Sequence, residues 1–193
     1  MTTALFPSDD LHDRPRDRAI TTEICRAFEL QSRPYQKIEH LVRTYIHEQS
    51  AQARVSSGGP LVLGIKSLLT KETVSGEVKF HLFVLPGHFR LDNYLLREHF
   101  PDWKNFRYCT LRELNERGRV VLPTALPPFG KPLLGVDFVH FDAGLIGRDD
   151  HVGFYAGSHS SSIIAHIRDL IAVVQPDDVF HFSKLAARTN DDL

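Results

Sequence analysis

The sequence predicts an α+β domain whose sheet is mixed or largely antiparallel. Two segments ahead of residue 56 repeat apolar residues at the three- and four-residue spacing of a helix. After the Ser56-Ser-Gly-Gly-Pro60 run, the chain changes to short β-like segments with helices between some of them. These segments do not alternate as regular βαβ units, so a purely parallel sheet is not expected.

Length and composition favour one soluble domain. The chain has 193 residues, of which 42% are apolar, which is enough to bury one core. It has no run of about 18 apolar residues that could span a membrane and no N-terminal signal peptide, so we expect a cytoplasmic protein without a membrane partner. Cys25 and Cys109 form no CxxC pair, and a net charge of −1 argues against a protein that coats nucleic acid over its whole surface.

The N-terminal part predicts an arm followed by two helices. Residues 1–18 are charged and lack an apolar period, so we expect a flexible arm ahead of a single domain at 19–193. A first helix is predicted after Thr21 and Thr22 from the spacing of Ile24, Ala27, Phe28 and Leu30. A second helix is predicted over Gln36–Gln52, ahead of the glycine-rich stop.

The rest of the chain predicts strands with three short helices. The predicted strands are Leu61–Leu69, Lys79–Leu85, Val120–Leu122, Leu133–Phe141, Val152–Tyr155, Ser162–Ala165 and an edge strand at Val179–Phe182. The predicted helices are Leu91–Phe100, a helix that opens with the capping box Thr110–Glu113 and ends at Gly118, and Ile167–Val174. A hairpin turn is expected around Ser75-Gly76-Glu77.

Several enzyme classes are excluded by missing motifs. The sequence has no Walker A motif, no dinucleotide-binding glycine motif and no nucleophile elbow, and His47-Glu48 lacks the second histidine of a zinc protease helix. The eleven histidines are scattered singly, so we expect no metal site. His159, in a loop of small residues, either meets a ligand or is simply exposed to solvent.

Two features point to a ligand site. Lys66 lies within the apolar strand segment Leu61–Leu69, where an unpaired ammonium would be costly to bury, so it either contacts a phosphate or carboxylate or extends its head into water. Thr124-Ala-Leu-Pro-Pro-Phe-Gly130 contains two prolines that fix the backbone as a stiff loop. Such a loop is either a connector between strands or a rigid set of backbone N–H donors.

The order of these segments resembles the YbaK/ProX-type aminoacyl-tRNA editing domain. The resemblance covers about residues 35–182 and rests on short motifs in a fixed order. These are Glu39-His40, Gly64-Ile-Lys66-Ser-Leu-Leu69, Phe83-Val-Leu-Pro-Gly87 with Arg90-Leu-Asp92, the 124–130 loop, Gly135-Val-Asp137, Ala156-Gly157 and Asp169-Leu170. It implies an α+β domain with a mixed or barrel-like sheet.

The resemblance also implies an activity and a set of residues. The implied activity is that of a free-standing, trans-editing deacylase that hydrolyses the ester of mischarged tRNA, for translation fidelity, without a cofactor. Its implied partners are the acceptor end of mischarged aminoacyl-tRNA and an aminoacyl-tRNA synthetase. The implied catalytic residues are Lys66, Thr124 and Ala125. The implied substrate-binding residues are His40, Ser67, Pro128, Gly130, Asp137, Gly157, His159 and Ser162.

The chain departs from the family pattern at three positions. Thr124 stands where the loop usually begins with glycine, Ser162 where some members have an acidic residue, and Glu39 where some have a tyrosine. A β-branched residue at position 124 narrows the approach of a ligand to the backbone. Two alternatives therefore stay open: a catalytically weak or inactive module that binds tRNA or a synthetase, and a hydrolase for another small ester or amide.

Overall fold

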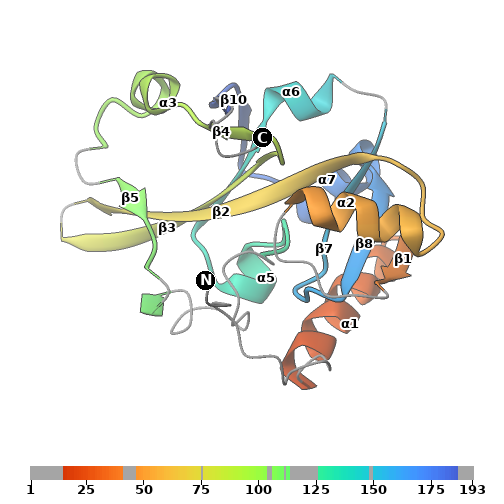
Figure 1. The fold of residues 1–193 in the computed structure, drawn as a ribbon. Helices are drawn as coiled ribbons and strands as arrows, with labels where there is room; N and C mark the ends of the chain where they lie inside the picture. Colours follow the sequence, from red (N-terminus) through yellow and green to blue (C-terminus); the bar gives the residue numbers. More distant parts are fainter. Residues whose placement is uncertain are drawn as a thin grey trace, which may run out of the picture.

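The computed structural model describes residues 15–40, 47–74, 76–103, 106–110, 112–113, 126–147 and 150–186 (Figure 1). Within these ranges, eight strands form one sheet and two more form a small second sheet. The path through the large sheet is β1-β8-β7-β2-β3-β6-β9, with β5 paired to β2 off this path. None of the helices that the structure describes is long and apolar enough to cross a membrane.

The helices are α1 (Pro15–Leu30), α2 (His47–Ser56), α3 (Asn93–His99), α5 (Lys131–Leu134), α6 (Ala143–Ile146) and α7 (Ile167–Val174). The strands are β1 (Gln36–Glu39), β2 (Leu63–Val74), β3 (Glu77–Pro86), β4 (Phe89–Leu91), β5 (Arg107–Tyr108), β6 (Phe138–Asp142), β7 (His151–Tyr155), β8 (Ser161–His166), β9 (Asp178–Phe180) and β10 (Ser183–Leu185).

The strand pairing confirms the predicted mixed α+β architecture. The pairs β1–β8, β7–β8, β2–β3, β2–β5 and β4–β10 are antiparallel. The pairs β2–β7, β3–β6 and β6–β9 are parallel. The longest pairing is the β2–β3 hairpin, which turns at Gly76 with a φ of +85°, as the sequence predicts around Ser75-Gly76-Glu77. Figure 1 shows β2 and β3 as the long ribbon that crosses the molecule.

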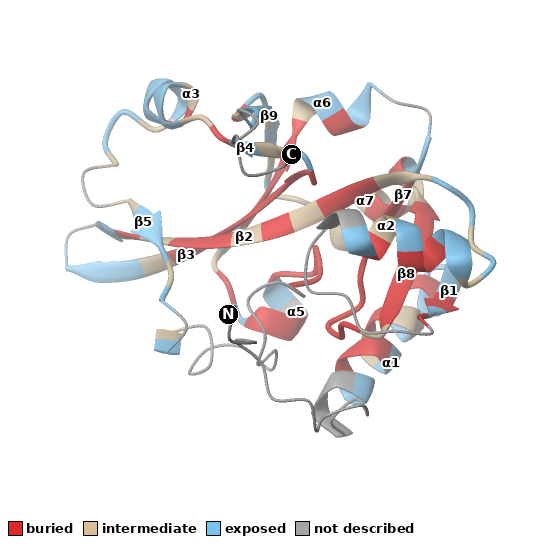
Figure 2. Ribbon diagram, in the orientation of Figure 1, coloured by how far each residue is buried: buried red, intermediate tan, exposed pale blue. Residues whose placement is uncertain are grey.

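The main core lies on one face of this sheet. Apolar side chains of β2, β3, β7 and β8 meet α1 and the segment from Leu126 to Leu134 there, and Figure 2 colours part of each of these elements as buried. The residues of α1 that enter this core are Ile20, Ile24 and Phe28, which share one helical stripe. Leu30, expected on the same stripe, is instead exposed.

A second apolar cluster lies against the hairpin and involves α3. Phe83 and Leu85 of β3 contribute to it, whereas Leu82 and Val84 of the same strand belong to the main core. Alternate residues of a strand point to opposite faces, so the second cluster packs on the face away from the main core. We refer to it as the α3 cluster; it consists of Phe83, Leu85, Leu91, Leu96 and Phe182.

Two predicted elements are wrong in type. Gln36–Glu39, predicted as the start of a helix, is strand β1, because its backbone pairs antiparallel with β8 and only Ile38 is buried. Leu133–Leu134, predicted as the start of a strand, lies in helix α5, which ends at Gly135 in the left-handed conformation. That glycine turns the chain into β6.

The structure adjusts other predicted boundaries and leaves some untested. Helix α1 begins at Pro15, so residues 15–18 belong to it and not to a flexible arm. The Thr110–Glu113 capping box is present, with the Thr110 N–H donating to Oε2 of Glu113 at 2.8 Å. The predicted arm over 1–14, the helix end at Gly118 and the strand Val120–Leu122 lie outside the described residues.

Candidate functional site

The face of the sheet away from the main core carries a group of polar side chains. On β7 and β8, Phe154 and Ile163 point into the main core, so Tyr155 and Ser162 point to the opposite face. On β2, Ile65 lies in the main core and Lys66 takes the opposite face by the same alternation. We call this region the polar face; its residues are His40, Arg54, Lys66, Tyr155 and Ser162.

His40 and Ser162, both predicted to bind substrate, are in direct contact. Ser162 Oγ and His40 Nε2 lie 2.9 Å apart, and both residues are buried. The backbone N–H of His40 also donates to the carbonyl of Ser160 at 2.7 Å. Tyr155 lies next to them, with its ring edge-on to His40 at a centroid distance of 6.4 Å. The residues following β1 and those of β8 thus build one buried polar cluster.

His159 is not the exposed loop residue that one interpretation of the sequence allows. Only 2% of it is exposed, and its ring lies 5.6 Å from the ring of Tyr155. Its loop is held by hydrogen bonds between small side chains and backbone, including Ser160 N–H to Ser158 Oγ at 3.0 Å. His159 is therefore a buried neighbour of the His40–Ser162 cluster, which it meets through Tyr155.

The described part of the proline loop lies on the other side of the sheet. Residues 126–130 are all buried, and Leu126 and Phe129 belong to the main core. Among the predicted substrate-binding residues, Pro128 and Gly130 lie in this segment. Ser67 also points to the main-core face, since it opposes Val84 in the β2–β3 register.

The structure does not bring this segment together with Lys66, because their side chains occupy opposite faces of the sheet. Lys66 is half-buried on the polar face. Thr124 and Ala125, the other predicted catalytic residues, lie outside the described residues.

Three other predicted site residues have clear packing or backbone roles. A Cβ at Gly130 would lie 2.5 Å from methyl groups of both Val136 and Val139, so this glycine permits close packing. Asp137 accepts the Phe80 N–H at 2.7 Å and links the start of β6 to β3. Gly157 has a φ of +82°, and a Cβ there would overlap Ile20 of α1.

Arg54 belongs to the polar face but is not among the site residues predicted from the sequence. It projects from α2 onto β7, where a Cβ at Gly153 would lie 2.9 Å from its Nε. Its guanidinium is buried and donates through Nη1 to Ser50 Oγ at 2.8 Å. The sequence gives no signal for this burial, because an arginine on a mixed helix is ordinarily solvated.

A hollow of about 470 Å³ opens beside the polar face. Its walls come from the start of β1, the segment before β2, and β7 and β8. They include Tyr35, Gln36, Pro60, Val62, His151 and Ile164. Gln36 and Ile164 are directly opposed in the β1–β8 register, and Ile164 also opposes Gly153. The hollow therefore lies next to the glycine on which Arg54 rests.

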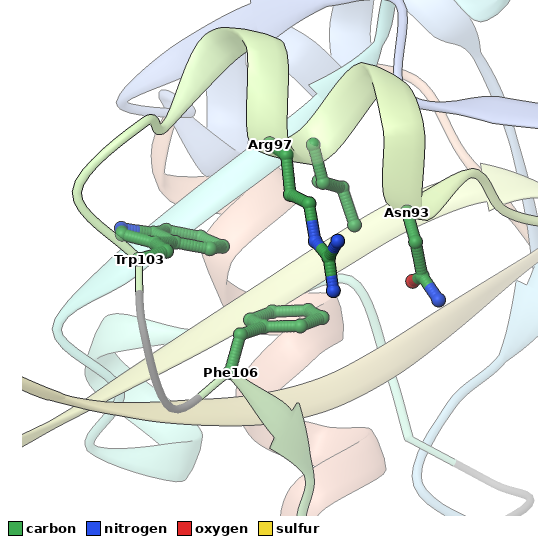
Figure 3. Close-up of a pocket in the computed structure, with 5 residues that line it drawn as sticks. Asn93, Arg97, Trp103 and Phe106 are labelled. Carbon is green, nitrogen blue, oxygen red and sulfur yellow. The ribbon is translucent and has the colours of Figure 1, made fainter.

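A smaller hollow of about 100 Å³ lies beside α3 (Figure 3). Asn93 and Arg97 project into it from one side of α3, and Trp103 and Phe106 form the facing aromatic surface. The Trp103 and Phe106 rings are stacked at 4.9 Å. Its walls are partly exposed aromatic rings and one guanidinium, and they include none of the predicted site residues that the structure describes.

A buried histidine pair lies within the sheet. His81 Nδ1 and His140 Nε2 are 2.9 Å apart, and His81 Nε2 lies 3.0 Å from Glu72 Oε1. Burial lowers the pKa of His81 to about 3, with His140 as a second cause, and burial lowers the pKa of His140 to about 4. The described residues hold no group of three or more side chains suited to a metal ion.

Comparison with solved structures identifies the fold. A hypothetical protein with 19% sequence identity aligns over 86% of this chain and 99% of its own, with a TM-score of 0.66. A candidate trans-editing enzyme for prolyl tRNA synthetase, also 19% identical, aligns over 90% and 99%, with a TM-score of 0.63. A structure from the computational grafting of linear epitopes onto scaffold proteins is 18% identical over 91% and 100%, with a TM-score of 0.63.

At these identities the likeness establishes the fold. This chain has the α+β fold of those proteins over nearly the whole of their length. No family model matches the sequence, and no curated protein matches it.

Proposed function

We propose that this protein is a trans-editing deacylase of the YbaK/ProX type that hydrolyses the ester of mischarged aminoacyl-tRNA. In this reaction a water oxygen forms a bond to the ester carbonyl carbon. The bond from that carbon to the ribose oxygen breaks, and the ribose oxygen takes up a proton. The amino acid and the tRNA are released.

One observation carries the proposal. One face of the sheet carries Lys66, His40 and Ser162, which the family resemblance assigns to the substrate. The fold of the chain is also that of a candidate trans-editing enzyme. In the proposed complex Lys66 binds a phosphate or the ribose of the terminal adenosine, as a cation suited to a negatively charged backbone. Thr124 and Ala125 are proposed to supply backbone N–H donors to the developing oxyanion.

A second candidate function is favoured by the burial of the proline loop. Its described residues pack into the main core, on the opposite face from Lys66. If the N–H groups of the loop do not reach the ester, the protein keeps a binding face without turnover. It would then act as a module that binds tRNA or a synthetase.

Single-turnover deacylation with a panel of aminoacyl-tRNAs separates the two. The protein is mixed in excess with each charged tRNA, and release of the amino acid is followed for the natural sequence, Lys66→Ala and the control Lys79→Ala. Lys79 lies on the same hairpin, is partly exposed and pairs with Glu77.

We expect release of one class of amino acid, a loss of about tenfold or more in rate for Lys66→Ala, and no change for Lys79→Ala. Tight tRNA binding with no release from any aminoacyl-tRNA would support the binding module. Cleavage of free amino-acid esters at a rate that does not depend on the tRNA would support a hydrolase for other small esters.

A further inference from the structure

Among the described residues, no carboxylate pairs with the buried guanidinium of Arg54. Only 1% of the residue is exposed, and Nη1 donates a hydrogen bond to Ser50 Oγ at 2.8 Å. In the described part of the chain, Nε and Nη2 are buried with no hydrogen-bond partner. Burial lowers the pKa of Arg54, opposed by the neighbouring Tyr155, but a guanidinium keeps its charge at any physiological pH.

A buried charge without a partner destabilises a protein unless something compensates it. Such groups are retained most readily where they serve a site. The two free nitrogens also have a defined geometry. The Nε–H and the outward N–H of Nη2 point the same way and form the side-on fork that matches two oxygens of a carboxylate or a phosphate. The unsatisfied part of Arg54 is therefore the part that binds an oxyanion.

The backbone of Gly153 lies directly beside the guanidinium of Arg54. A Cβ at Gly153 would lie 2.9 Å from Nε and 3.0 Å from Cζ, so any larger residue there would displace the guanidinium. Gly153 pairs in register with Gly64 of β2. The position of β2 next to Gly153 therefore also carries no side chain. Lys66 follows Gly64 by two positions and shares its face, which places a second cation on this side of the sheet.

Gly153 also lies close to a wall of the larger hollow. The same hypothetical Cβ at Gly153 would lie 3.0 Å from Cγ2 of Val62, and Val62 lines the 470 Å³ hollow. Val62 and the Arg54 guanidinium therefore both lie close to Gly153, and Val62 forms part of the wall of the hollow.

We propose that Arg54 and the adjoining hollow form a binding site for an oxyanion, held by two parallel hydrogen bonds from Nε and Nη2. The ligand carries a phosphate or a carboxylate, with the remainder of the molecule in the hollow. This inference does not rest on the proposed deacylase activity, since it concerns binding by a residue to which that activity assigns no role.

The test measures anion binding to the full chain by calorimetry and by thermal unfolding, at constant ionic strength set with chloride. The probes are inorganic phosphate, 5′-AMP and acetate. The variants are Arg54→Met, which removes the charge, Arg54→Lys, which keeps the charge but not the fork, and the exposed control Arg97→Met.

We expect saturable binding and a raised unfolding temperature with phosphate and 5′-AMP, or with acetate, in the natural sequence and in Arg97→Met. The responding probe identifies the phosphate or the carboxylate as the ligand group. Affinity should fall about tenfold or more in both Arg54 variants. Arg54→Met should unfold no more easily than the natural sequence without anion, because it removes a buried unpaired charge.

Two results would overturn the proposal. One is the absence of saturable binding of any of the three probes by the natural sequence, a measurement that needs no variant. The other is binding that Arg54→Lys retains at full strength. If Arg54→Met fails to fold, Arg54→Lys and the natural sequence still decide the question.

Discussion

Gly157 illustrates how a single residue is fixed by two separate constraints. Its φ of +82° lies in the left-handed region, and a Cβ at this position would overlap the side chain of Ile20 on α1. Gly58 has a nearly equal φ of +85° but no atom within 4 Å of the Cβ position. Comparing substitutions at the two positions therefore distinguishes the cost of backbone strain from the cost of side-chain overlap.

We predict that Gly157→Ala destabilises the protein more than Gly58→Ala does. The backbone term should cost about 1 kcal/mol in both, and overlap with Ile20 should add roughly 1–3 kcal/mol in Gly157→Ala. Urea unfolding measures both. In the Ile20→Ala background, Gly157→Ala should cost less than in the natural sequence. Equal costs for the two alanine variants would show that Ile20 does not restrict position 157.

At the residue scale, the sequence indicated which side chains are polar candidates for a site, but it did not indicate how deeply each side chain is buried. The family resemblance implies His40 and Ser162 as substrate-binding residues, and the two side chains are in contact across 122 positions of chain. Arg54 and His159 could not be placed from sequence, because their burial depends on packing by β7 and by the loop after it. The environment of a side chain depends on tertiary contacts, which cannot be derived from a single sequence.

At the element scale, local signals succeeded where they agreed with the tertiary context. Ile167–Val174 forms α7 with the predicted bounds, because it is strongly amphipathic and Pro176 follows it. Gln36–Glu39 was wrongly predicted to be helical. Its residues carry no strong strand preference, and its conformation is decided by pairing with β8, which lies more than 120 positions later.

Helix α3 offers a test of how an element is fixed to its neighbours. Asp92 caps it, since its Oδ1 accepts the Tyr94 N–H at 2.9 Å, and Oδ2 lies 3.0 Å from Nζ of Lys184 on β10. The pKa of Asp92 is lowered, first by its hydrogen bond with Lys184 and then by that with the Tyr94 N–H. One carboxylate thus joins the helix start to the small second sheet.

We predict that Asp92→Ala lowers the urea midpoint, because the cap and the ion pair are both lost. Asp92→Asn should lower it less, since the amide oxygen keeps the cap. Lys184→Gln should lower the midpoint in the natural sequence but have no further effect in the Asp92→Asn background. The same decrease for Asn and Ala at position 92 would contradict a capping role.

At the scale of the whole molecule, the sheet separates two apolar regions with different chemistry. The main core is almost wholly hydrocarbon, whereas aromatic rings close to the α3 cluster surround His81 and His140. Those in ring contact with one or both histidines include Phe83, Phe100, Trp103, Phe138 and Phe180. The sequence, with its histidines scattered singly, predicted neither this pair nor its link to Glu72. The pair forms because β3 and β6, with Phe83 opposite His140 in register, lie side by side in the fold.

This buried pair should make the folded state sensitive to acid. In the neutral pair one arrangement satisfies both contacts: His140 Nε2–H donates to His81 Nδ1, and His81 Nε2–H donates to Glu72. A proton on Nδ1 of His81 would face the N–H of His140, so protonation opposes this network. The lowered pKa values, about 3 for His81 and about 4 for His140, have burial as their main cause.

The sign of the pH dependence follows from these pKa values. In the unfolded chain both histidines take up protons near their ordinary value of about 6.5. The unfolded state therefore binds more protons than the folded state below that pH, and the stability held above about 6.5 is lost as the pH falls toward 4. Burial raises the pKa of Glu72, which acts in the opposite sense, so comparison with a variant is more informative than the absolute curve.

We predict that His140→Phe loses less stability than the natural sequence between pH 7 and pH 4.5. Phenylalanine suits the surrounding rings and removes one of the two groups that must stay neutral. The difference in the loss should be on the order of 2 kcal/mol, measured by urea unfolding at a series of pH values. The control is His88→Phe at an exposed position, which should keep the slope of the natural sequence. An unchanged slope in His140→Phe would mean that the buried pair does not set the acid sensitivity of the fold.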